Sequence, residues 1–253
     1  IVFEPFYENY GPDAILSGAT PRYVTLHPPA WSFDGDELAA AFNDNTKAII
    51  INTPNNPTGK VFSREELEFI ASLCRKWNVI AITDEIYEHI LFNGKKHVAI
   101  ATLDGMRDRT ITINGLSKTY SVTGWRVGYC VARPALTREL RKVHQFNAFS
   151  IAAPLQAAIR LYLQRHPDAW RAVSGFFGAK RDLLLARLAG SGLTLPPAQG
   201  SYFQLADYSL VADCGDVEFT ERLINDAGVA VIPLSPFYRE PPAGMRVVRL
   251  CVA

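Results

Sequence analysis

The chain has 253 residues but only four cysteines and two methionines. Cys74, Cys130, Cys214 and Cys251 form no Cys-x-x-Cys pair, and no histidine stands at metal-ligand spacing from any of them. This spacing disfavours a zinc site or a disulfide framework. We therefore expect no metal, and buried or half-buried free thiols, as in a protein of the reducing cytoplasm.

Long apolar runs and an excess of charge of one sign are also missing. No run approaches the roughly 20 residues that a membrane span needs, and the first residues do not form a secretory signal. The net charge is +1, from 26 basic and 25 acidic residues, so no strong field attracts nucleic acid or an anionic membrane. We expect neither partner. A nicotinamide dehydrogenase is disfavoured as well, because no Gly-x-Gly-x-x-Gly turn follows a strand.

The chain does have the composition of an ordinary globular domain, with 48% hydrophobic and 20% charged residues. Residues 1–3 and 246–252 read as strands that run up to the two ends of the chain. We therefore expect a fragment truncated at both ends.

Short apolar runs alternate with helical patterns in the first half. Strands are predicted at 47–52, 79–83, 110–114 and 126–131. A helix is predicted to start at Ser63, because Ser63 and Glu66 form a capping box. This rhythm predicts an α/β fold with a mostly parallel sheet and helices on both faces.

The pattern changes after Pro134. Helices are predicted at 135–149, 155–165 and 168–188, followed by strands at 201–206, 229–232 and 245–252 and a helix at 217–227. We interpret this part as a smaller α+β domain. The predicted domains are residues 1–170 and 171–253.

Polar segments follow three of the predicted strands: residues 52–59, 84–87 and 114–128. Each has an ordinary explanation, since Asn-Pro-Thr-Gly makes turns, an aspartate caps helices and a loop lysine is usually solvated. Together they favour a ligand site, because open α/β sheets bind ligands at the carboxyl ends of their strands.

The three segments resemble motifs of one family. The run Ser117–Gly128, with Lys118 in its second position, is similar to the Schiff-base motif of class I/II aminotransferases, the fold type I enzymes of pyridoxal 5'-phosphate (PLP). Residues 55–59 and 84–87 match the family's two other cofactor motifs in the right order. The resemblance covers essentially the whole chain. It implies a large PLP-binding domain whose N-terminal part is missing, and a small domain whose last helices are missing.

The resemblance implies roles around the cofactor ring. Lys118 matches the lysine that holds PLP in a Schiff base, and Asp84 matches the carboxylate that pairs with the pyridine nitrogen. Tyr87 and Asn56 match the donors to the phenolic oxygen. A carboxylate at this place favours the protonated nitrogen, which makes the ring a stronger electron sink.

Further roles concern the phosphate and the substrate. Arg126 matches the phosphate-binding cation, helped by the Ser117 hydroxyl, and Tyr7 falls where the family stacks an aromatic ring on the cofactor. Arg249 matches the arginine that binds the substrate α-carboxylate, with Asn56 beside it. A guanidinium offers two parallel donors to a carboxylate, which a lysine cannot do.

The implied reaction is transamination. Lys118 moves a proton from the substrate Cα to the cofactor C4' carbon, and a second 2-oxo acid reverses the steps in a ping-pong cycle. Residues 52–57, 60–67, 199–203 and 249–251 look most similar to the kynurenine, glutamine and methionine aminotransferase branch. That branch implies an aromatic, methionine or glutamine-like amino acid. Phe149, Phe237 and Tyr238 are candidates for its side-chain pocket or for ordinary core positions.

The sequence departs from the family pattern at two places, and alternatives to the aminotransferase stay open. Gly115 stands where some family members carry a serine, so one phosphate contact differs. The segment with the substrate-covering arm and the Gly/Ser/Thr phosphate loop is not part of this sequence. A homodimer is implied by the resemblance alone. A β-lyase on the same scaffold and a PLP-sensing regulator remain alternatives to the aminotransferase.

Overall fold

A computed structural model describes all residues, 1–253. Its largest element is a seven-stranded sheet in the order β3-β2-β1-β4-β5-β6-β7. Strands β1, β2, β4, β5 and β6 are parallel, and the edge strands β3 and β7 pair antiparallel to their neighbours. The strands are β1 (Val2–Glu4), β2 (Tyr23–His27), β3 (Ser32–Phe33), β4 (Ala48–Asn52), β5 (Ile80–Asp84), β6 (Thr110–Gly115) and β7 (Gly128–Val131).

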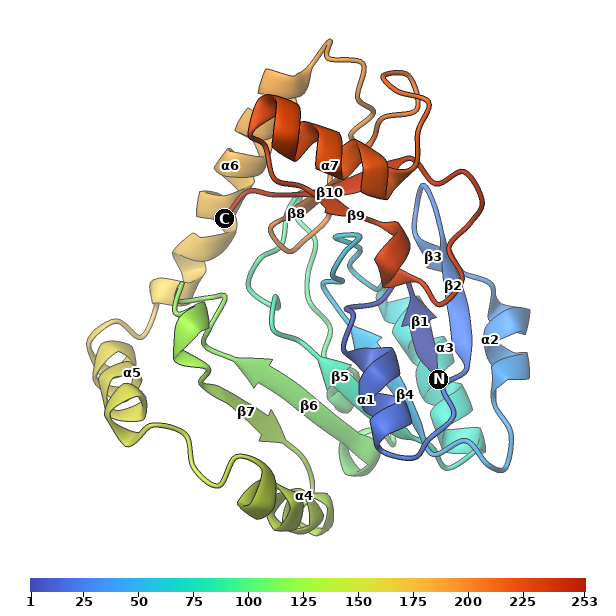
Figure 1. Cartoon of the computed structure of the whole chain (residues 1–253). Coiled ribbons are helices and arrows are strands. Elements are labelled where there is room, and N and C mark those ends of the chain that lie inside the picture. Colours follow the sequence, from blue (N-terminus) through green and yellow to red (C-terminus); the bar gives the residue numbers. More distant parts are fainter.

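Helices cover this sheet. Helix α1 crosses in front of it and α3 lies behind it in Figure 1. The apolar sides of α2 and α3 pack on strands β1, β2, β4 and β5 in a core of 19 buried residues. These helices are α1 (Tyr10–Leu16), α2 (Gly35–Ala41) and α3 (Arg64–Lys76). The predicted fold class, an α/β fold with a mostly parallel sheet, is confirmed.

Helix α3 shows how closely local sequence specifies an element here. The backbone N–H of Glu66 donates to Ser63 Oγ at 3.2 Å, and the N–H of Ser63 donates to Glu66 Oε2 at 2.8 Å. This is the predicted capping box, and the helix begins directly after it. Leu67, Ile70 and Cys74 then recur at helical spacing and are buried.

The second half of the chain forms helices and a small sheet. Strand β10 lies between β8 and β9 and is antiparallel to both. The elements are α4 (Pro134–Asn147), α5 (Ala153–Arg165), α6 (Val173–Leu188), β8 (Phe203–Asp207), α7 (Asp216–Ala227), β9 (Ile232–Pro233) and β10 (Val247–Cys251). The predicted strand at 229–232 is wrong except for its last residue. The predicted domain boundary near residue 170 stays a prediction.

Short 3₁₀ turns connect several of these elements. They are Ile100–Thr102, Arg107–Arg109, Thr123–Trp125, Ala169–Ala172 and Ser235–Phe237. The predicted helix at 168–188 is therefore a 3₁₀ turn that runs directly into α6.

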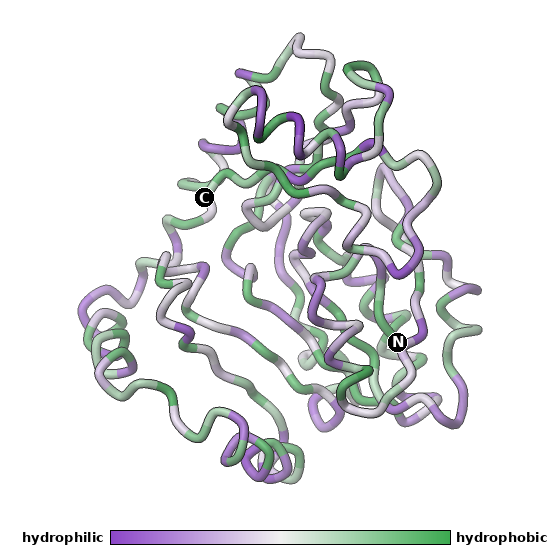
Figure 2. Tube along the Cα trace, viewed as in Figure 1, coloured by the Kyte–Doolittle hydropathy of each residue, from purple (hydrophilic) through white to green (hydrophobic).

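One side of the molecule is thinly packed. Helices α4 and α5 stand at the edge beyond β7, away from the main sheet (Figure 1). All four residues of β7 are exposed, and α4 has no buried residue. In Figure 2 the central strands are mostly hydrophobic, whereas α4 and α5 alternate between hydrophobic and hydrophilic residues.

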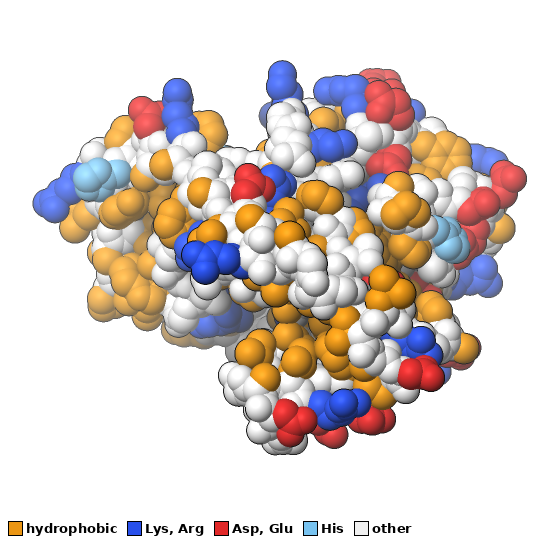
Figure 3. All heavy atoms as spheres, turned by 90° about the horizontal axis from the view of Figure 1, so that it is seen from above, with side chains coloured by type: hydrophobic (Ala, Val, Ile, Leu, Met, Phe, Trp, Pro, Cys, Tyr) orange, Lys and Arg blue, Asp and Glu red, His pale blue; other side chains and the backbone are white.

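The face drawn in Figure 3 shows no large area of one charge sign. Lysine and arginine side chains are interspersed with aspartate and glutamate over the face drawn in Figure 3. None of the helices combines the length and the apolarity that a membrane crossing requires.

Candidate active site

A cavity of about 370 Å³ lies at the carboxyl ends of β4, β5 and β6. Polar residues from the loops after these strands line it together with residues from the β1–α1 segment and from β10. The cavity brings together all eight residues that the sequence predicts for the site: Tyr7, Asn56, Asp84, Tyr87, Ser117, Lys118, Arg126 and Arg249.

Asp84 is the last residue of β5, and its carboxylate is held on both oxygens. The N–H of Ile86 donates to Oδ1 at 3.1 Å, and the hydroxyl of Tyr10 donates to Oδ2 at 2.6 Å. Burial raises the pKa of Asp84 above its usual value, and these two hydrogen bonds act in the opposite direction. A cation placed against this carboxylate would favour its charged form further.

The loop after β4 is tied to the end of β5. Asn52 donates from Nδ2 to the carbonyl oxygen of Asp84 at 3.0 Å, and its Oδ1 accepts the N–H of Asn56 at 2.7 Å. Asn56 is 6% exposed. Its position in the cavity is therefore fixed by the same neighbour that holds the Asp84 backbone.

Lys118 lies in the loop between β6 and β7, which pair antiparallel with Gly115 opposite Gly128. A Cβ on Gly128 would lie 3.0 Å from the carbonyl oxygen of Asn114, so glycine permits the close approach of the two strands at the base of the loop. Lys118 Nζ is 5.6 Å from the centre of the Tyr202 ring. Arg126 ends the loop in the left-handed conformation, with φ of 56°.

Tyr87 lies one turn beyond Asp84 and is almost fully buried. Its ring meets the rings of Tyr202 and Phe203 edge-on, with centroids 5.3 and 5.9 Å apart. Burial raises the pKa of Tyr87, and the nearby Tyr202 adds to the effect. Tyr87 therefore presents a neutral phenol, which can donate a hydrogen bond into the cavity.

Arg249, on the central strand of the small sheet, reaches across to the large sheet. Its Nη1 donates to Asn56 Oδ1 at 2.6 Å, and its guanidinium carbon lies 4.1 and 4.9 Å from the ring centres of Phe203 and Phe237. Burial lowers its pKa, while the carboxylate of Glu8 acts against that shift. Its Nε is buried without a hydrogen-bond partner, so the group has donors left for an anion.

Several residues that line this cavity were not predicted as site residues, and two of them hold Asp84 through their side chains. Tyr10 and Asn52 both line the cavity, and both contact Asp84. Asn52 carried a usable signal, since it directly follows the buried run Ile49–Ile51. Tyr10 carried none, because its contact with Asp84 spans 74 positions of the chain.

Some sequence expectations are corrected here. Phe237 and Tyr238 are buried and Phe237 covers Arg249, whereas Phe149 is 77% exposed; none of the three lines the cavity. The four thiols are free, yet Cys130 and Cys251 are exposed rather than buried or half-buried. Cys130 lies on β7, whose residues are all exposed, and Cys251 is the last residue of β10.

The mostly parallel sheet, with a polar cavity at its carboxyl edge and a small antiparallel sheet above it, is the architecture of fold type I PLP enzymes. The chain belongs to the aminotransferase class I and II family, which matches residues 1–253. It is 38% identical over its full length to methionine aminotransferase of Escherichia coli strain K12, and 37% identical over 95% of its length to human kynurenine–oxoglutarate transaminase 1.

Solved structures give the same result. The fold superposes with a TM-score of 0.95 and 37% identity on YbdL of Escherichia coli, described as having a methionine aminotransferase function. It superposes with a TM-score of 0.94 and 36% identity on N-succinyldiaminopimelate aminotransferase of Mycobacterium tuberculosis. Each comparison covers 99% of this chain. The chain spans 64–66% of the length of these four relatives.

PLP is the cofactor of this family, and the residues present fit it. The cavity falls in the size range of small-ligand sites. Asp84 offers a carboxylate for the pyridine nitrogen, and Tyr87 and Asn56 offer a neutral phenol and an amide for the phenolic oxygen. Lys118 offers an amine for the aldehyde. Arg126 and Ser117 offer a guanidinium and a hydroxyl for the phosphate.

Proposed function

We propose that the protein is a PLP-dependent aminotransferase that exchanges an amino group between an L-amino acid and a 2-oxo acid. The observation that carries this proposal is the convergence of Lys118, Asp84 and Arg249 on one cavity. Family membership and the two named relatives support the same reaction class.

Each residue has a role that follows from its place in the cavity. Arg249 binds the substrate α-carboxylate with donors that Asn56 leaves free, and Phe203 and Phe237 fix its plane. Arg126 and Ser117 bind the phosphate. Asp84 keeps a proton on the pyridine nitrogen, and Tyr10 keeps Asp84 in place.

The bound cofactor supplies an electron sink for the pair released when the Cα–H bond breaks. Lys118 Nζ is the base that takes the Cα proton, because it is the amine that lines the cavity. Tyr87 and Asn56 would donate hydrogen bonds to the phenolic oxygen of the bound cofactor, and Tyr7 would lie against its ring.

We also propose the narrower properties that the relatives suggest. The amino donor is methionine, kynurenine or another amino acid with a neutral side chain, because the relatives are named for methionine and kynurenine. A homodimer in the cytoplasm is the proposed state. The free thiols suit a reducing compartment. A β-lyase is not favoured, because the named relatives are aminotransferases.

The covalent role of Lys118 can be tested directly. The purified protein mixed with PLP should turn yellow, and borohydride should fix the cofactor on Lys118, as read by peptide mass. Lys118→Ala should abolish the adduct. Lys142→Ala is the matched control, because Lys142 pairs with Glu139 on the surface. An adduct that persists at the same site in Lys118→Ala would contradict the assignment.

The substrate proposal needs a separate assay. Methionine, kynurenine, glutamine, phenylalanine and aspartate are offered as donors with a 2-oxo acid acceptor, and both the new 2-oxo acid and free ammonia are measured. Transamination releases no ammonia, whereas β-elimination does. Ammonia as the main product would overturn the proposed reaction, and a preference for aspartate would overturn the proposed substrate class.

A further inference from the structure

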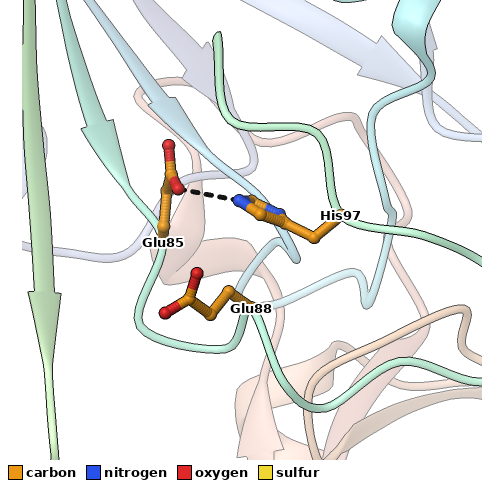
Figure 4. Close-up of side chains that lie close together, drawn as sticks. All are labelled: Glu85, Glu88 and His97. Atoms are coloured by element: carbon orange, nitrogen blue, oxygen red, sulfur yellow. Dashed lines mark hydrogen bonds and ion pairs between the residues drawn. The ribbon is translucent and has the colours of Figure 1, made fainter. Parts of the chain in front are cut away.

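A second cluster of ionisable side chains lies directly behind the candidate active site. It consists of Glu85, Glu88 and His97, whose ligand atoms all lie within 4.8 Å of one another. Glu85 and Glu88 follow β5 on the turn that carries Asp84 and Tyr87, and His97 comes from a separate segment further along the chain (Figure 4). None of the three lines the cavity.

Glu85 is the centre of the cluster and is 2% exposed. Its Oε1 accepts the Thr83 hydroxyl at 2.9 Å, and its Oε2 lies 2.7 Å from His97 Nε2. The backbone N–H of Glu85 donates to the carbonyl oxygen of Ile113 on β6. One residue thus joins the end of β5, the neighbouring strand and the His97 segment.

Glu88 makes a second link to the strand that leads to Lys118. Its Oε1 accepts the side-chain N–H of Asn114 at 2.6 Å. Asn114 in turn accepts the backbone N–H of Gly115 on its Oδ1 at 2.7 Å. Gly115 is the last residue of β6 and opens the Lys118 loop. The turn that holds Asp84 and the loop that holds Lys118 are therefore connected through Asn114, which itself lines the cavity.

A metal ion is a poor fit for this cluster. A histidine that binds a metal nearly always donates its other ring N–H to an acceptor, but His97 Nδ1 is buried without any partner. The 2.7 Å separation of His97 Nε2 from Glu85 Oε2 is instead that of a charge-assisted hydrogen bond.

We propose that His97 is a positioning residue for the cofactor, which acts by holding the buried Glu85 carboxylate and thereby the adjoining Asp84–Tyr87 turn against the Lys118 loop. This inference rests on the proposed function. Without His97, a buried carboxylate loses its main partner, and such a group moves toward water when it can. Because Asp84 directly precedes Glu85 in the chain, a movement of Glu85 shifts the Asp84 carboxylate, which is proposed to face the pyridine nitrogen. The charge of Glu85 also acts to raise the pKa of Asp84.

The experiment compares His97→Ala, His97→Gln and the double variant Glu85→Gln/His97→Ala with the unchanged protein. Equilibrium binding of PLP and the circular dichroism of the cofactor's visible band are measured. His97→Ala is expected to weaken PLP binding about tenfold, a common size for coupling between neighbouring sites, and to alter the visible band. His97→Gln keeps a donor for Glu85 and should recover most of the affinity. The double variant removes the buried charge and should also recover part of it.

His27→Ala is the matched control, since His27 also faces a glutamate through Nε2, at 3.7 Å from Glu37, but on the surface and outside the cavity lining. Melting temperatures of the cofactor-free proteins separate binding from folding. A His97→Ala protein that melts earlier but keeps its PLP affinity and its visible band overturns the inference. Zn²⁺ or Mn²⁺ binding that the unchanged protein shows by calorimetry and His97→Ala loses would overturn it too. A failure of the unchanged protein to bind PLP would instead refute the proposed function.

Discussion

Arg249 is oriented before any substrate is present. Asn56 accepts from one of its nitrogens, two aromatic rings flank its plane, and its Nε faces no partner. The arrangement restricts the side chain to one direction and leaves donors for a carboxylate. A lysine at this place would keep a positive charge but would have neither the plane nor the paired donors.

We therefore predict that Arg249→Lys lowers kcat/KM for every amino donor by roughly 10- to 100-fold, the size expected when a paired charge contact is broken. Steady-state kinetics with methionine and with a second donor give the measurement. PLP affinity is the control and should fall far less, because Asn56, the cofactor-binding residue that Arg249 contacts, is also held by Asn52. An equal loss in PLP affinity would contradict this division of roles.

Asp84 should make the stability of the cofactor-free protein depend on pH. Burial raises its pKa in the folded state, so the unfolded state ionises first as the pH rises. The destabilisation by Asp84 therefore begins near pH 3.8, the pKa of the unfolded state, and grows as the pH rises. It reaches its full size above the pKa of the folded state.

The variant Asp84→Asn removes that cost. We predict that the cofactor-free variant is more stable than the unchanged protein at pH 7, and that the difference vanishes below the unfolded pKa of Asp84. Urea unfolding at several pH values measures it. A difference that is constant with pH would show that the effect comes from packing. With PLP added the order should reverse at pH 7, since a pyridinium then stabilises the charged carboxylate.

The sequence predicted eight cavity residues but could not predict their supports. Lys118, Asp84 and Arg249 lie in segments with recognisable motifs, and those motifs predict their roles. Tyr10 and His97 make their contacts with residues 74 and 12 positions away in the chain. Such contacts depend on which strands are neighbours, and no local pattern near Tyr10 or His97 contains that information.

At the scale of elements, the contribution of the α3 capping box to stability can be measured by mutation. Ser63 accepts the N–H of Glu66, and Glu66 also pairs with Lys60 at 2.7 Å. We predict that Ser63→Ala destabilises the protein by about 1 kcal/mol, the usual cost of losing such a cap. Urea unfolding measures it. Ser72→Ala, an exposed substitution further along the same helix, should be neutral or slightly stabilising, because alanine favours helix. Equal losses in both variants would contradict a capping effect.

Elements with strong local signals were predicted well, and short ones were not. Strands β4 and β5 are mostly apolar runs, and β6 alternates threonine with isoleucine; all three are predicted from the sequence to within a residue. The sequence reading identified neither β2 nor β3, because β2 is short and half-buried and β3 has only two residues. Strand β9 also has only two residues and was misplaced. Their pairing is set by neighbouring strands more than by their own composition.

At the scale of the whole molecule, the unusual feature is the uncovered side formed by β7 and α4. Val131, Val143, Phe146 and Phe149 are 60, 67, 87 and 77% exposed. The sequence predicted a helix over this part, and the structure has one, but a helical pattern does not say whether its apolar residues meet a partner. Exposed apolar side chains that gather on one side of a protein mark an interaction site or promote association.

We predict that a protein consisting of residues 1–253 binds the dye ANS strongly and self-associates as its concentration rises, because this side stays open to water. The double substitution Val143→Glu/Phe146→Glu should reduce both effects severalfold, an order-of-magnitude expectation for removing two of the most exposed apolar side chains. It should leave the melting temperature nearly unchanged, since neither side chain is packed in the fold. Arg141→Glu, on the same helix, changes the charge without removing apolar surface and is the control. A double variant that unfolds readily would show that these side chains are packed in solution. Unchanged ANS binding by a folded double variant would show that the uncovered side is not the source of the association.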